Sequence, residues 1–130
     1  MSDISFIKNN QIDKLDFGSG LVLKVFFDEE NGARNFSLGT VTIEPNCETS
    51  MHTRTVEEVI YMISGEGEVV TEEGERYTLL SGDSILIPAG ISHKHVNSSE
   101  KSLEQMWIFA PQGEEVGLRD LPKLNLKLKE

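Results

Sequence analysis

The three histidines of this 130-residue sequence are the residues whose type and spacing most directly suggest chemistry. His93 and His95 stand two residues apart in a short stretch, residues 92–97, that reads as a β-strand. Since alternate side chains of a strand leave the same face, both imidazole rings should project together. Their Cβ atoms would then lie roughly 6–7 Å apart, close enough for both rings to reach one metal ion.

The third histidine, His52, lies upstream in a stretch that also carries Glu58. This stretch and the segment 82–97 together resemble the two signature motifs of the cupin superfamily. The second motif matches at each of its fixed positions, which are Gly82, Pro88, Gly90, His93 and Asn97. The first motif matches at His52, Glu58 and Gly65, but Asn46 replaces the usual glycine and Arg54 the usual second histidine.

The resemblance covers about residues 38–110 and implies an all-β fold. The expected architecture is an antiparallel double-stranded β-helix, the cupin or jelly-roll barrel, in a single domain. Residues 1–37 would flank the barrel, residues 38–110 would form it, and residues 111–130 would be a C-terminal extension.

His52, Glu58 and His93 would form a set of two histidines and one carboxylate. Neutral imidazoles and a carboxylate suit Fe(II), Mn(II), Ni(II) or Zn(II) and leave coordination positions open for a substrate. Such a site orients a substrate oxygen and stabilises negative charge on an enolate or alkoxide. The resemblance implies a similar centre, because most metal-bearing cupins draw three histidines and one glutamate from these positions.

Arg54 complicates this interpretation, because a guanidinium stays protonated and has no lone pair to offer a metal. In a first interpretation, His95 or water fills the vacancy and Arg54 binds a substrate carboxylate through paired hydrogen bonds. In a second, Arg54 pairs with Glu58 and the barrel holds no metal. In a third, Arg54 turns out into solvent.

Among the other side chains of these stretches, one has two open interpretations. His95 is either a proton carrier or substrate contact, or part of the cavity wall. Ile60 and Met62 share the face of Glu58 and should line the cavity, whereas Tyr61 should point away. Asn97 should fix a turn through backbone hydrogen bonds.

The last predicted barrel strand, residues 103–110, carries a second group of candidates. Trp107 and Phe109 alternate on one face, where they serve as core or as pocket wall. Glu104 and Gln105 are the polar candidates of that strand.

The elements that must position these residues are short strands separated by Gly and Pro. The predicted strands are residues 21–27, 36–44, 58–63, 68–71, 76–80, 84–87, 92–97 and 103–110. Such a series favours an antiparallel sandwich or barrel. Asn31-Gly32 predicts a hairpin turn, residues 45–51 a loop, and the alternating leucines of 121–128 a further strand.

Composition limits the partners. The net charge of −10 and pI of about 4.7 disfavour nucleic acid and anionic membranes. The single Cys47 excludes an internal disulfide, and no apolar run is long enough to span a membrane, so we expect a cytoplasmic protein.

The sequence therefore predicts a small cupin, resembling homodimeric relatives, with a divalent-metal site and a small-molecule ligand. The function would be metal-assisted isomerase, lyase or dioxygenase chemistry on a small anionic, oxygen-bearing molecule. Here His52, Glu58 and His93 hold the metal, while Arg54 and His95 are the catalytic candidates. The alternative is a non-catalytic module that binds a sugar or small acid, with or without metal.

Overall fold

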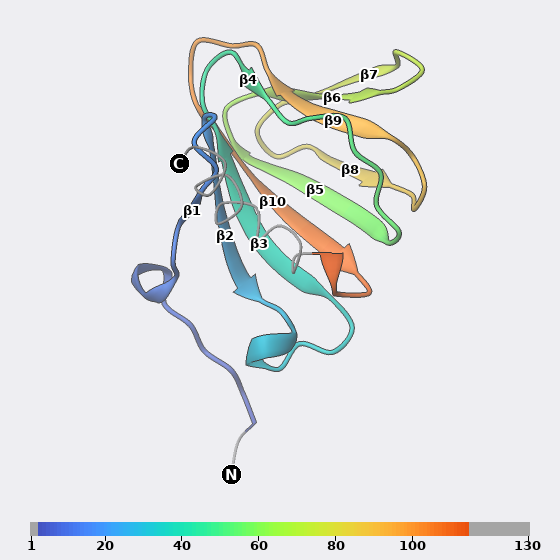
Figure 1. The fold of residues 1–130 in the computed structure, drawn as a ribbon. Helices are drawn as coiled ribbons and strands as arrows, with labels where there is room; N and C mark the ends of the chain where they lie inside the picture. Colours follow the sequence, from blue (N-terminus) through green and yellow to red (C-terminus); the bar gives the residue numbers. More distant parts are fainter. Residues whose placement is uncertain (1–2, 115–130) are drawn as a thin grey trace, which may run out of the picture.

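Two antiparallel sheets, packed face to face, make up the computed structural model, which describes residues 3–114 (Figure 1). The larger sheet has the strand order β1-β2-β3-β10-β5-β8. Its strands are β1 (Leu15–Asp16), β2 (Leu21–Phe27), β3 (Ser37–Ile43), β10 (Leu103–Ala110), β5 (Glu57–Ser64) and β8 (Ser84–Ile87). The smaller sheet, β4-β9-β6-β7, contains β4 (Cys47–Glu48), β9 (His93–Asn97), β6 (Gly67–Thr71) and β7 (Arg76–Leu79).

This arrangement confirms the predicted all-β fold. Each predicted strand appears within about two residues of its expected bounds, because apolar residues alternate clearly along the chain. None of the helical turns between residues 3 and 114 is long and apolar enough to cross a membrane. The predicted strand of residues 121–128 lies outside the described residues.

Two connections differ from expectation. Instead of a tight hairpin at Asn31-Gly32, a single 3₁₀ turn, η2 (Glu29–Asn31), joins β2 to β3. Asp28 caps this turn by accepting a hydrogen bond from Glu30 N, as expected of Asp before a helical turn. A similar turn, η1 (Asn9–Gln11), precedes β1. The predicted loop 45–51 contains the short strand β4, which pairs with β9.

Asn46 explains one departure from the cupin pattern. Its φ angle is 58°, in the left-handed region that favours glycine. Asn is among the residues that tolerate this region best, because its short polar side chain adapts to it. The residue therefore keeps the turn that a glycine would make ahead of β4.

The core lies between the two sheets and fixes the inner face of each strand. In β10, alternate residues Leu103, Gln105, Trp107 and Phe109 are buried. Trp107 can lie against β3 because its partner there is Gly39, where a Cβ atom would collide with the indole ring and with the Lys24 carbonyl. The absence of a side chain at Gly39 therefore leaves the space that the indole ring occupies.

Asn97 closes the turn after β9, as expected from the sequence. Its Nδ2 donates to the carbonyl oxygens of Ile43 and Lys101 at 2.9 and 2.8 Å. Its Oδ1 accepts hydrogen bonds from the backbone and hydroxyl of Ser99 at 3.0 and 2.7 Å. Because the side chain is fully buried, these hydrogen bonds are what satisfies its own polar atoms.

Replacing Asn97 by alanine should therefore lower the free energy of unfolding by about 2–3 kcal/mol, because the hydrogen bonds of a fully buried side chain are lost together. Urea denaturation measures this change. Ser98→Ala, at the exposed neighbouring position, is the control and should leave stability within about 0.5 kcal/mol of the original. Equal stability of the two variants would contradict the role given to Asn97.

Candidate metal centre

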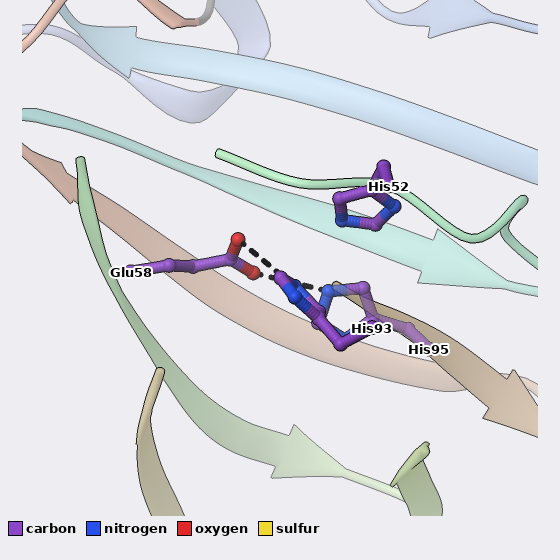
Figure 2. Close-up of side chains that lie close together, drawn as sticks. All are labelled: His52, Glu58, His93 and His95. Carbon is purple, nitrogen blue, oxygen red and sulfur yellow. Dashed lines mark ion pairs between the residues drawn. The ribbon is translucent and has the colours of Figure 1, made fainter. Parts of the chain in front are cut away.

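Four side chains from three segments converge inside the barrel: His52, Glu58, His93 and His95 (Figure 2). Each offers one nitrogen or oxygen atom, and these atoms all lie within 4.8 Å of one another. Glu58 comes from β5 in the larger sheet, whereas His93 and His95 come from β9 in the smaller one. The site therefore joins the two sheets across the core.

His52 is held beside β9 by backbone pairing. Its N–H donates to the His93 carbonyl at 2.9 Å, and the His93 N–H donates back to the His52 carbonyl at the same distance. This isolated bridge fixes His52, which directly follows the predicted loop 45–51, against β9. The two imidazole centroids are consequently only 4.4 Å apart.

The structure thus brings together the three residues expected to meet, and adds His95 to them. His93 and His95 are both buried, as the strand alternation predicted. Ile60 lines the cavity and Tyr61 is exposed, both as expected, whereas Met62 packs in the core, outside the cavity lining.

The rings of His52 and His93 are oriented by backbone carbonyls. Nδ1 of His52 lies 2.8 Å from the Ser50 carbonyl, and Nδ1 of His93 lies 2.8 Å from the Ile91 carbonyl. Because a carbonyl oxygen can only accept, Nδ1 carries the proton in the neutral form of each ring, and Nε2 then holds the lone pair. Such outer contacts are typical of metal-binding histidines.

Glu58 lies among the imidazoles and is 2% exposed. Its Oε2 is 3.0 Å from His95 Nε2, and its Oε1 is 3.3 Å from His93 Nε2 (Figure 2). Although burial alone would raise its pKa, His93 and His95 together lower the pKa of Glu58 well below its usual range. The carboxylate is therefore ionised at neutral pH.

The histidine pKa values differ in direction. Burial lowers the pKa of His52 from 6.5 to about 4, although the hydrogen bond with the Ser50 carbonyl acts to raise it by a smaller amount. Burial also acts to lower the pKa of His93, but Glu58 and the Ile91 carbonyl outweigh it and raise that pKa. His52 is thus neutral at pH 7 and can donate an electron pair to a metal. In the metal-free chain, by contrast, Glu58 favours the protonated form of His93.

The donor set fits a divalent transition metal. His52 Nε2 is buried and has no hydrogen-bond partner among residues 3–114, and His93 Nε2 and Glu58 Oε1, also buried, make no hydrogen bond there beyond their mutual 3.3 Å contact. Unpartnered buried polar atoms are rare and call for an explanation. Imidazole nitrogens and a carboxylate oxygen turned toward one point are the ligands that Fe, Mn, Ni and Zn accept.

Arg54 lines the same cavity, and only 19% of its side chain is exposed. The interpretation in which it turns out into solvent is therefore wrong: burial against Phe109 holds the guanidinium, with Cζ 5.4 Å from the ring centroid. Its Nε lies 4.0 Å from Glu58 Oε1, and its Nη1 lies 3.7 Å from Glu114 Oε2. Arg54 stands between two carboxylates without a short bond to either.

Glu114 is a neighbour that the sequence did not reveal. Its Oε1 accepts hydrogen bonds from the backbone N–H and the hydroxyl of Thr55, at 2.8 and 2.7 Å. Burial acts to raise the pKa of Glu114, but Thr55 and Arg54 lower it overall. No motif connects residues 59 positions apart, so only the folded chain shows this contact.

The cavity beside the four residues has a volume of about 380 Å³. This is within the roughly 300–1,000 Å³ typical of small-molecule sites. Its walls are mainly apolar and include Leu21, Leu23, Val41, Ile60, Trp107 and Phe109. The polar residues of its lining include His52, His95, Glu58, Arg54 and Gln105.

Comparison with known proteins supports the fold. Similar solved structures include an RmlC-like cupin from Shewanella frigidimarina, with 22% identity, TM-score 0.72, and coverage of 85% of this chain and 94% of that one. KdgF from a Halomonas species has 22% identity, TM-score 0.74, and coverage of 86% and 97%. The polyketide cyclase RemF from Streptomyces resistomycificus has 20% identity, TM-score 0.73, and coverage of 82% and 79%.

At these identities, the shared feature is the barrel. A search of curated protein sequences gives no match. The sequence model of the cupin domain, however, matches residues 39–109, more than half of the chain and including each of the four converging residues. The chain therefore belongs to the cupin domain family.

Proposed function

We propose that His52, Glu58, His93 and His95 hold one divalent transition metal in the barrel. Two observations carry this proposal. One ligand atom from each of the four residues lies within 4.8 Å of the others, and His52 Nε2 is buried without a hydrogen-bond partner among residues 3–114. An ionised carboxylate and a neutral His52 supply electron pairs without first losing a proton at pH 7.

In this proposal His95 supplies the ligand that Arg54 cannot. Arg54 occupies the position of the usual histidine, but a guanidinium has no lone pair. His95 reaches the same group from β9, with its ring centroid 5.6 Å from that of His52 and 5.1 Å from that of His93. Ligation is therefore a better use of His95 than the proton carrier considered first.

Arg54 would bind a negatively charged group of the ligand. Its Nε has no hydrogen-bond partner in the described part of the chain, and the 3.7 Å contact of Nη1 with Glu114 exceeds a normal hydrogen bond. The guanidinium can thus accept a carboxylate on two parallel N–H groups. Phe109 packs against it, with Cζ over the aromatic ring at 5.4 Å from the centroid.

The function that we propose is metal-assisted isomerase, lyase or dioxygenase chemistry on a small anionic, oxygen-bearing molecule. The metal would supply Lewis acidity or an open coordination position for that chemistry. Arg54 orients the anionic end, Glu58 and the histidines keep their lone pairs inward, and the apolar walls exclude water. A homodimer in the cytoplasm remains the expected state.

One observation favours the metal-free alternative, a module that only binds a small acid. Arg54 Nε lies 4.0 Å from Glu58 Oε1, close enough for the charges to attract. If Arg54 formed a close ion pair with Glu58, the carboxylate would no longer be available as a metal ligand. His93 and His95 would then lose their anionic partner. Metal content separates this alternative from the proposal.

Elemental analysis of protein purified without a chelator or an affinity tag should show close to one transition metal per chain. His93→Ala should lose the metal, because this variant lacks one of the proposed ligands. Loss of a residue that only supports a ligand already lowers metal affinity roughly 10–100-fold, and loss of the ligand itself should lower it more. Lys94→Ala, between the two β9 histidines and paired with Glu48 instead, is the matched control and should retain the metal. Metal-free wild-type protein, even after reconstitution with Fe, Mn, Ni and Zn, would support the binding module.

Arg54→His should bind Mn²⁺ about tenfold more tightly or better, because a charge is removed and a ligand is added. The same variant should bind benzoate about 10–100-fold more weakly, since hydrogen bonds to a charged group contribute roughly 1.5–3 kcal/mol. Calorimetric titration measures both affinities. Arg54→Lys keeps the charge without the paired donors and should fall between; unchanged affinities in Arg54→His would exclude the role given to Arg54.

A further inference from the structure

Gln105 is a buried polar side chain that the proposed metal centre does not use. It is 3% exposed, lies on the inner face of β10 and lines the cavity. Its neighbours on that face are Leu103, Trp107 and Phe109, so Gln105 is the one amide in an otherwise apolar row of this strand. A leucine or methionine would fit such a row without burying a polar group.

The amide of Gln105 has an unmet hydrogen bond. Its Nε2 atom is buried and has no partner among residues 3–114, and the same is true of Trp107 Nε1 two residues further along. Burying an amide without a partner costs about 1–3 kcal/mol. Two such donors on one strand face, both belonging to residues of one cavity wall, indicate an acceptor that comes with a ligand.

The strand itself is irregular at this residue. The pairing of β10 with β5 shifts between Glu104 and Gln105, so that Glu104 pairs with Ser64 but Gln105 with Met62. A bulge of this kind changes the direction of a side chain and is common beside active sites. The backbone thus departs from regular pairing at the point where the amide enters the cavity wall.

The rest of the cavity limits what the ligand can be. The rings of Trp107 and Phe109 are stacked, with centroids 5.0 Å apart and an interplanar angle of 27°. Arg54 lies over Phe109, so the cation and the aromatic wall are adjacent. A sugar would leave most of its hydroxyl groups without partners on these apolar walls, whereas a flat apolar body would be buried favourably.

We propose that Gln105 is a specificity-determining residue that donates a hydrogen bond to a second oxygen of the ligand. The ligand class is a carboxylic acid with a flat, apolar body that carries this oxygen as a hydroxyl or carbonyl group. The proposal rests on the proposed function for the placement of the carboxylate at Arg54. The role of Gln105 itself rests on its buried, unpartnered amide nitrogen and its place in the cavity lining.

The test uses the full chain loaded with Mn²⁺ and a panel of acids: benzoate, 3- and 4-hydroxybenzoate, cyclohexanecarboxylate and galacturonate. Trp107 is the only tryptophan, so its fluorescence reports binding in this cavity. At least one hydroxybenzoate should bind about fivefold or more tightly than benzoate, since a hydrogen bond contributes roughly 0.5–1.5 kcal/mol. Cyclohexanecarboxylate and galacturonate should bind more weakly than benzoate.

Gln105→Met should reduce the advantage of the hydroxyl group to less than about twofold, because it removes the amide and keeps the volume. Glu104→Gln, on the neighbouring outward position, should keep the full advantage. Persistence of the advantage in Gln105→Met, or tighter binding of galacturonate than of any aromatic acid, would overturn the proposal.

Metal analysis of the same samples separates this inference from the proposed function. If the wild-type chain carries no metal but still distinguishes the acids through Gln105, the metal proposal fails and the specificity role stands. If metal is present and Gln105→Met distinguishes the acids as the wild type does, only the specificity role fails.

A ligand-free measurement distinguishes specificity from a structural role. Because Gln105→Met removes an unpartnered buried donor, the metal-free variant should melt roughly 2–5 °C above the wild type. If Gln105 instead served the fold, the variant would melt at or below the wild-type temperature, which would contradict the proposal.

Discussion

The buried carboxylate of Glu58 is the constraint on which the rest of the site depends. An ionised carboxylate in a protein interior is costly unless paired charges or a metal compensate it. Glu58 projects from β5 of the larger sheet, while its partners His93 and His95 project from β9 of the smaller one. The site therefore forms only when the two sheets pack against each other, so that the same packing that closes the barrel also brings the ligand atoms together.

The sequence was sufficient for the fold and for most of the site because its signals are local or follow a known spacing. Alternation of apolar residues located the strands and placed His93 and His95 on one face. The motif spacing located His52 and Glu58. The turn role of Asn97 also followed from its residue type, since its amide bonds to Ser99 within the turn, although its bond to Ile43 on β3 did not.

The remaining features depend on contacts between distant residues, which no local pattern encodes. The sequence left open where Arg54 goes, and the answer came from Phe109 and Glu114, residues beyond the motif on another part of the chain. The unmet hydrogen bond of Gln105 was equally hidden, because polarity on a strand does not show whether a partner exists. Such departures from a well-satisfied core are expected where a chain gives up stability for binding.

Anomalous X-ray diffraction from crystals grown with Co²⁺ tests the central claim most directly. It should show a single strong peak about 2.0–2.2 Å from nitrogen atoms of His52 and His93 and an oxygen of Glu58, with His95 completing the set. Arg54 should then remain beside Phe109. A structure at saturating Co²⁺ with no peak among these side chains, and with the Arg54 guanidinium bonded to Glu58, would contradict the claim that the barrel is built around a metal.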